Sequence, residues 1–132
     1  MDVLLITPFD ASAQRLRDTV KRALAEVGVN VKMPDSWESE DAADALIGAI
    51  TSTDLVIADV SRENPNVFYE LGYAHALRKN TILLVSKDAN PRFPFDIAGS
   101  YVFSYDPQNL RALGEYLQHR VSGLKRRREA LA

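Results

Sequence analysis

The sequence predicts an α/β domain in which a five-stranded, doubly wound parallel sheet, with strand order near 2-1-3-4-5, carries helices on both faces. The first observation is that short apolar runs alternate with helical apolar periodicity along the chain. The second is that residues 55–58 and 81–85 are nearly continuous apolar runs, which is typical of central parallel strands covered on both faces. The third is the length of 132 residues, which suits one domain spanning residues 1–132.

The first half of the chain supplies two strands and two helices. Residues 3–6 form a run of mostly branched apolar side chains, which predicts a buried strand. Apolar residues then recur at helical spacing over residues 11–27, and Gly28 is a typical helix end. Residues 29–33 alternate between apolar and polar, which predicts a strand near the sheet edge. A second helix begins near Ser39, and its predicted buried stripe comprises Ala42, Ala45, Leu46, Ala49 and Ile50.

The second half supplies three strands and two helices. The predicted strands are residues 55–58, 81–85 and 101–105. Asn64 is a typical N-cap, and Pro65 fits the first position of a helix that runs to about residue 78. Asp106 and Pro107 open the last helix, whose apolar face consists of Leu110, Leu113, Leu117 and Val121.

The composition excludes several classes of function. A formal net charge of −2 argues against a broad electrostatic footprint for nucleic acid. The chain has no cysteine and only two histidines, His75 and His119, so disulfides and the common histidine metal motifs are excluded, and no metal or cofactor is expected. No apolar run approaches the roughly 20 residues of a membrane span, and the N-terminus lacks the basic segment of a signal peptide. We therefore expect a cytoplasmic protein that binds neither membrane nor nucleic acid.

Open parallel sheets bind ligands outside the carboxyl ends of their strands, where the strand order reverses. In this chain the reversal lies between the first and third strands, which are followed by the polar loops at residues 7–10 and 59–64. The third helix starts at the same edge, and its free N–H groups suit an anion such as a phosphate. The residues expected to contact a ligand in this crevice are Thr7, Phe9, Asp10, Asp59, Ser61, Asn64 and Asn66.

Most of these residues also have a structural interpretation. Asp59 either binds ribose hydroxyls or caps its loop, and Phe9 either stacks on a base or fills its loop. Asp10 fits a helix cap better than a ligand contact. Asn64 caps the third helix, which leaves its amide donors free for a ligand. For Asn66 the two interpretations are equally good.

Glu70 is the candidate catalytic residue. It lies about a turn and a half into the third helix, too far in to act as a cap, and its side chain leans back toward the helix N-terminus and the crevice. A helical glutamate is usually solvated, and that interpretation stays open for Glu70. Its neighbours Phe68, Tyr69 and Leu71 do not form a solvated face, however, so a carboxylate among them needs a reason.

The run NPNVFYELGYAHA at residues 64–76, preceded by the strand at 54–59, resembles the nucleoside 2-deoxyribosyltransferase-like superfamily. The resemblance is closer to its bacterial TIR-like branch, which is described as nucleotide-binding. That branch has a strand-x-Pro-Phe-Asp start and a late Pro-Phe-Asp, which residues 7–10 and 94–96 match. The likeness spans nearly the whole chain, and the 64–76 run is its specific part.

The resemblance implies a flavodoxin-like fold and an enzyme acting at an N-glycosidic bond, as a glycosidase, an NAD hydrolase or a deoxyribosyltransferase. It implies that Glu70 is the nucleophile and that the substrate is NAD, a nucleoside or a nucleoside monophosphate, with NAD as substrate rather than cofactor. The alternative is a non-catalytic TIR-like module that senses a nucleotide or self-assembles. Because no further domain is evident in this chain, a homo-oligomer or a separate partner protein is expected.

Overall fold

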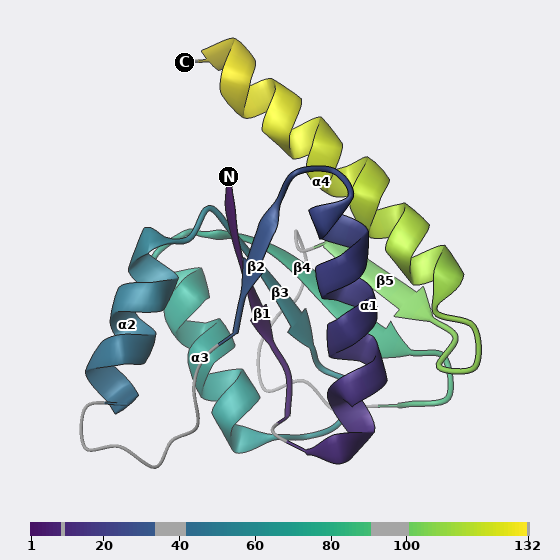
Figure 1. Ribbon diagram of the computed structural model, residues 1–132. Coiled ribbons are helices and arrows are strands. Elements are labelled where there is room, and N and C mark those ends of the chain that lie inside the picture. Colours follow the sequence, from purple (N-terminus) through teal and green to yellow (C-terminus); the bar gives the residue numbers. More distant parts are fainter. Residues whose placement is uncertain (9, 34–41, 91–100, 132) are drawn as a thin grey trace.

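The computed structural model describes residues 1–8, 10–33, 42–90 and 101–131, which form a five-stranded parallel sheet with helices on both faces (Figure 1). The strand order is β2-β1-β3-β4-β5, so the predicted fold class and strand order are confirmed. The elements in chain order are β1 (Asp2–Ile6), the 3₁₀ turn η1 (Ala11–Ala13), α1 (Gln14–Ala25), β2 (Asn30–Lys32), α2 (Ala42–Ser52), β3 (Leu55–Asp59), α3 (Pro65–Ala76), β4 (Asn80–Ser86), β5 (Tyr101–Tyr105) and α4 (Arg111–Leu131).

The central strand β3 is buried along its whole length because helices cover both faces of the sheet there. Its side chains alternate between two cores, as a strand requires. Leu55 and Ile57 join the core beneath α1 and α4, while Val56 and Ala58 join the core beneath α2 and α3. This alternation decides which face each residue near the end of β3 serves, and the site depends on it.

Helix boundaries differ from the predictions at several points, each with a local cause. The predicted first helix is a 3₁₀ turn followed by α1, which stops at Ala25, and Gly28 then takes a φ of +74°. The last helix begins at Arg111 rather than Asp106, because the Asp106 carboxylate accepts a hydrogen bond from the Gln108 N–H and closes a turn.

The predicted stripe of α2 is partly wrong. Leu46 and Ile50 are buried, whereas Ala45 is exposed. The predicted start of that helix near Ser39 and the Pro-Phe-Asp match at residues 94–96 lie outside the described residues.

The C-terminal part of the long helix α4 is tied to the amino ends of the central strands β1 and β3. Arg128 forms an ion pair with Asp54, whose carboxylate also accepts the N–H of Asp2 at 2.7 Å. Within the described ranges, no helix has both the length and the apolar character needed to cross a membrane.

Candidate functional site

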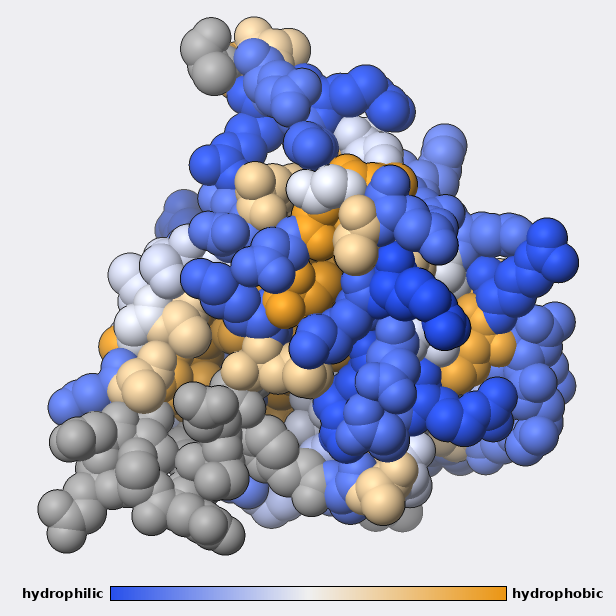
Figure 2. Space-filling view, viewed as in Figure 1, coloured by the Kyte–Doolittle hydropathy of each residue, from blue (hydrophilic) through white to orange (hydrophobic). Residues whose placement is uncertain are grey.

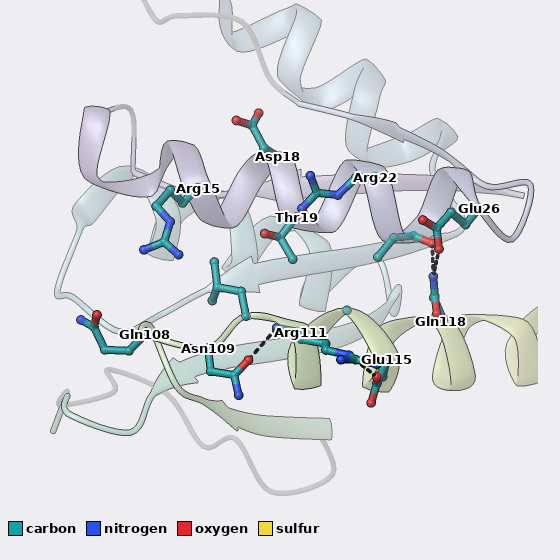
Figure 3. A pocket seen from close by; sticks show the side chains of 13 residues that line it. Arg15, Asp18, Thr19, Arg22, Glu26, Gln108, Asn109, Arg111, Glu115 and Gln118 are labelled. Carbon is teal, nitrogen blue, oxygen red and sulfur yellow. Dashed lines mark hydrogen bonds and ion pairs between the residues drawn. The ribbon is translucent and has the colours of Figure 1, made fainter.

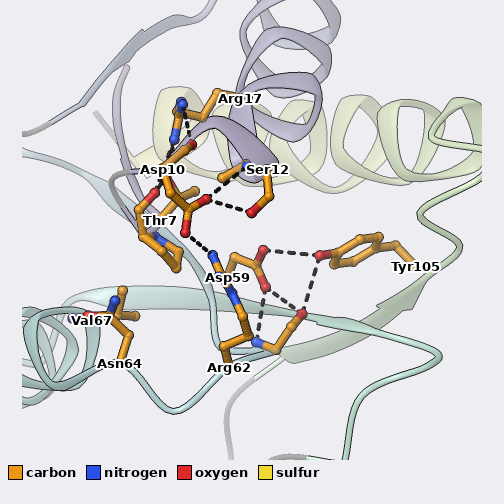
Figure 4. A network of polar contacts seen from close by, with 12 residues as sticks. Thr7, Asp10, Ser12, Arg17, Asp59, Arg62, Asn64, Val67 and Tyr105 are labelled. Atoms are coloured by element: carbon orange, nitrogen blue, oxygen red, sulfur yellow. Dashed lines mark hydrogen bonds and ion pairs between the residues drawn. The ribbon is translucent and has the colours of Figure 1, made fainter.

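The loops after β1 and β3 meet at the carboxyl edge of the sheet, as predicted for the reversal of strand order. Arg62 from the β3–α3 loop donates to Asp10 of the β1–α1 loop at 2.5 Å (Figure 4). Arg17 of α1 holds the β1 loop from behind, because its guanidinium donates to the Thr7 hydroxyl and to two loop carbonyls at 3.0–3.3 Å. Sequence reasoning missed both arginines. Arg62 and Asp10 lie 52 positions apart, and Arg17 reaches back 7 to 10 positions to partners that are mostly backbone carbonyls, which side-chain patterns do not reveal.

Asp10 acts as the predicted cap. Its carboxylate accepts hydrogen bonds from the Ser12 hydroxyl at 2.6 Å and the Ala13 N–H at 3.2 Å. The hydrogen bonds from Ser12 and then Arg62 lower the pKa of Asp10 below its usual range. With these partners, most of the acceptor capacity of Asp10 is already used in the loop.

Asp59 and Ser61 lie together in a buried polar cluster that also contains Tyr105 from the end of β5 (Figure 4). Asp59 Oδ1 accepts from the Ser61 hydroxyl at 2.6 Å and the Ser61 N–H at 3.0 Å, and Oδ2 accepts from the Tyr105 hydroxyl at 3.0 Å. The Ser86 N–H donates to Ser61 Oγ at 2.7 Å. Burial and then the Asp59 charge raise the pKa of Tyr105 to about 12, so this hydroxyl keeps its proton and donates.

Tyr105 is a site residue that the sequence analysis did not name. A signal for it was present, because β5 was predicted to end at residue 105, at the same sheet edge as Asp59. Polar residues at the carboxyl ends of neighbouring parallel strands approach one another there.

Asn64 caps α3 as predicted. Its side-chain oxygen accepts the N–H groups of Asn66 at 3.0 Å and Val67 at 3.2 Å, and Pro65 occupies the first turn. Asn66 is exposed on that turn. The amide donors of both asparagines are therefore placed at the N-terminus of the helix that carries Glu70.

Glu70 is 2% exposed, so the solvated interpretation is wrong. It follows Val67 and precedes Leu71 and Ala74 on the buried side of α3, and all three belong to the core beneath α2 and α3. Among the described residues, no hydrogen bond or ion pair reaches its carboxyl group. Burial alone raises the pKa of Glu70 from 4.5 to about 7.

The predicted site residues therefore fall into separate groups. Thr7 and Asp10 belong to the β1 loop held by Arg17. Asp59 follows the parity of Leu55 and Ile57 and faces the side of α1 and α4, together with Ser61. The third group, which comprises Asn64, Asn66 and Glu70, is carried by α3 on the other side of the sheet. Phe9 lies outside the described residues.

Several hollows lined by described residues open on the side of α1 and α4, and Glu70 is not among the residues that line them. Two of them concern the site. The edge pocket, of about 440 Å³, has Asp59, Ser61 and Tyr105 among its lining residues. The helix groove, of about 700 Å³, runs between α1 and α4, with Arg15, Arg22 and Glu115 among the charged side chains along it (Figure 3). Figure 2 shows that hydrophilic residues dominate the surface over these two helices. The described residues contain no group of three or more histidine, aspartate or glutamate side chains placed to hold a metal ion.

No protein-family model matches the chain, and no curated protein matches it in sequence. Solved structures do resemble it. A CMP N-glycosidase of Clostridium botulinum matches with a TM-score of 0.65 and 24% identity, over 89% of this chain and 98% of that one. A 2-deoxyribosyltransferase of Bacillus psychrosaccharolyticus matches with a TM-score of 0.61 and 17% identity, over 82% and 88% of the two chains.

A flavodoxin-like domain from Synechococcus sp. matches with a TM-score of 0.58 and 17% identity, over 90% of this chain and 92% of that one. At these identities the likeness establishes the fold, and the predicted flavodoxin-like fold is confirmed.

Proposed function

We propose that this domain binds a nucleotide-like ligand and that Glu70 cleaves or transfers at the ligand's N-glycosidic bond. The substrate class is NAD, a nucleoside or a nucleoside monophosphate. The observation that carries the proposal is the state of Glu70, which is buried in the core-facing side of α3 and has no polar partner among the described residues. A structural carboxylate in such a place would be expected to have one.

The pKa of about 7 fits the chemistry. Near neutral pH about half of Glu70 is ionised, so the buried carboxylate that the proposed step requires is present at the working pH. In the proposed step the bond from C1′ to the base nitrogen breaks, and its electron pair leaves with the base. The Glu70 carboxylate either stabilises the positive charge that develops on the sugar while water or a second base bonds to C1′, or forms a C1′–O bond that water or a second base then displaces.

The surroundings of Glu70 offer binding groups of suitable chemistry. Asn64 and Asn66 lie at the start of the same helix, and their amide groups can donate to sugar hydroxyls or to a phosphate. The N-terminus of α3 adds backbone N–H groups and the positive end of a helix dipole, which favour an anion. These features suit a nucleotide better than an uncharged nucleoside.

The likeness to enzymes named for an N-glycosidase and a deoxyribosyltransferase reaction supports the reaction class. The sequence run at residues 64–76 also supports it, because in that resemblance the residue at the position of Glu70 is the nucleophile. Whether the acceptor is water or a second base is a question for the assay.

The test is release of free base by wild type and by Glu70→Gln, with NAD and a panel of ribo- and deoxyribonucleosides and their monophosphates, followed by chromatography. We expect wild type to release base from at least one class and the variant to be slower by about 100-fold or more. Glu129→Gln, the same change at an exposed glutamate near the end of α4, is the matched control and should retain activity. Binding of a nucleotide by both forms without release from either would contradict catalysis and favour the sensing module.

A further inference from the structure

The edge pocket lies apart from Glu70 and has a composition of its own. Its walls come from the ends of β3, β4 and β5 and the loops after β3 and β4, from η1 and the beginning of α1, and from the segment between β5 and α4. Its volume of about 440 Å³ falls within the range of small-molecule sites. No part of the proposed reaction at Glu70 requires this pocket.

The floor of the pocket presents acceptors for hydroxyl donors. Asp59 and Tyr105 are each 8% exposed. The Ser61 and Tyr105 hydroxyls both donate to Asp59, so neither hydroxyl proton is available to a ligand. Among the described residues, Asp59 Oδ2 receives only the Tyr105 hydroxyl, which leaves one of its lone pairs for a ligand, and the Tyr105 oxygen also retains acceptor capacity.

The pocket is lined by charges of both signs: Asp88, in the loop after β4, adds a second carboxylate to that of Asp59, whereas the rim on the side of α1 is cationic. Arg15 lines the pocket, is exposed, and forms no hydrogen bond or ion pair with another described residue. Arg62 lines the same side and is bound to Asp10 through one nitrogen. The guanidinium fork of Arg15 is therefore available for a bidentate contact with a phosphate or carboxylate.

We propose that the edge pocket binds a sugar phosphate, with sugar hydroxyls donating to Asp59 and Tyr105 and the phosphate on Arg15. A phosphate alone matches the rim but meets the Asp59 charge on the floor. A neutral sugar matches the floor and leaves Arg15 unused. A sugar phosphate has hydroxyl donors at one end and a phosphate at the other. This arrangement matches the pocket, where the acceptors Asp59 and Tyr105 lie on the floor and Arg15 lies on the rim.

This site goes beyond the proposed function and does not depend on it, because Glu70 belongs to the helix on the opposite face of the sheet. The two proposals therefore fail separately. Loss of base release in Glu70→Gln says nothing about the pocket, and loss of sugar-phosphate binding in a pocket variant says nothing about Glu70.

The experiment is calorimetric titration of the full chain with ribose 5-phosphate and glucose 6-phosphate. Ribose, inorganic phosphate and glycine serve as separate probes. We expect a sugar phosphate to bind at least about tenfold more tightly than ribose or phosphate. Glycine stands for the rival class of ligand, an amino acid, whose ammonium group could contact Asp59 and whose carboxylate could contact Arg15. Tighter binding of glycine than of either sugar phosphate would overturn the assignment.

Two arginines of α1 form a matched pair of variants. Arg15→Gln should weaken sugar-phosphate binding by about tenfold and leave ribose binding unchanged. Arg22→Gln, two turns further along the same exposed face and outside the edge pocket, should leave both unchanged.

Two further results would overturn the proposal. These are no saturable binding at about 10 mM sugar phosphate and equal losses in the two arginine variants. Tyr105→Phe gives a further check if it folds, because it should weaken ribose 5-phosphate binding and spare phosphate binding. Should it not fold, the arginine pair still decides the outcome.

Discussion

Replacement of Glu70 by glutamine should change the pH dependence of stability. The unfolded chain releases the Glu70 proton near pH 4.5, whereas the folded protein holds it until about pH 7. Between these values unfolding releases a proton, so the free energy of unfolding of wild type falls as the pH rises. The difference between the two pKa values corresponds to about 3 kcal/mol, and the loss is complete about one pH unit above the folded pKa. The glutamine variant has no such proton, so this decline is absent from it.

We therefore expect the free energy of unfolding of Glu70→Gln, relative to that of wild type, to rise by about 3 kcal/mol between pH 4.5 and pH 8. Any fixed cost of burying the amide is the same at every pH and cancels from this difference. Urea unfolding followed by circular dichroism across that range measures it. Glu129→Gln, at an exposed position, controls for general effects of removing a charge. A stability difference between Glu70→Gln and wild type that stays constant with pH would refute the burial argument.

Three further predictions concern stability and use the same urea assay. Tyr105→Phe leaves Asp59 Oδ2 without its donor in a buried cluster and should cost about 1–3 kcal/mol; no loss would mean that this hydrogen bond is unimportant. Asn64→Ala removes the cap of α3 and should cost about 0.5–2 kcal/mol, while Asn64→Asp should keep most of it; equal losses would argue against capping. Lys79→Met removes the donors to two carbonyl groups at and just beyond the end of α2 and should lower the free energy of unfolding by about 1 kcal/mol. Hydrogen exchange should then show faster exchange at that end of α2, and faster exchange spread evenly over the fold would contradict the local role.

The fold could be predicted because its signals are local or nearly so. The apolar run of β3 and the helical stripe of α1 each identify an element within one window of sequence. Right-handed crossovers then leave few strand orders for alternating strands and helices. Ala45 was misassigned because the small side chain of an alanine is tolerated on either side of a helix.

The site was predicted less completely, for two physical reasons. Strand parity was available, since Asp59 falls in step with Leu55 and Ile57, but the predicted strand ended at residue 58 and Asp59 was assigned to the loop, where parity does not apply; in the structure Asp59 is still paired, with Leu84. The contacts of Arg62 with Asp10 and of Tyr105 with Asp59 join residues 52 and 46 positions apart, and no local pattern encodes them. Glu70, in contrast, could be singled out because a carboxylate inside an apolar helical run is unusual in any context.

The central claim is that the Glu70 carboxylate breaks an N-glycosidic bond, and the most direct test is the rate of base release as a function of pH for wild type and Glu70→Gln. We predict that wild-type kcat/KM, which reports the free enzyme, rises with pH through a midpoint near 7, as the buried acid becomes a carboxylate, and that the variant is slow at every pH. Equal release by the folded variant, or no release by wild type from any member of the panel, would contradict it.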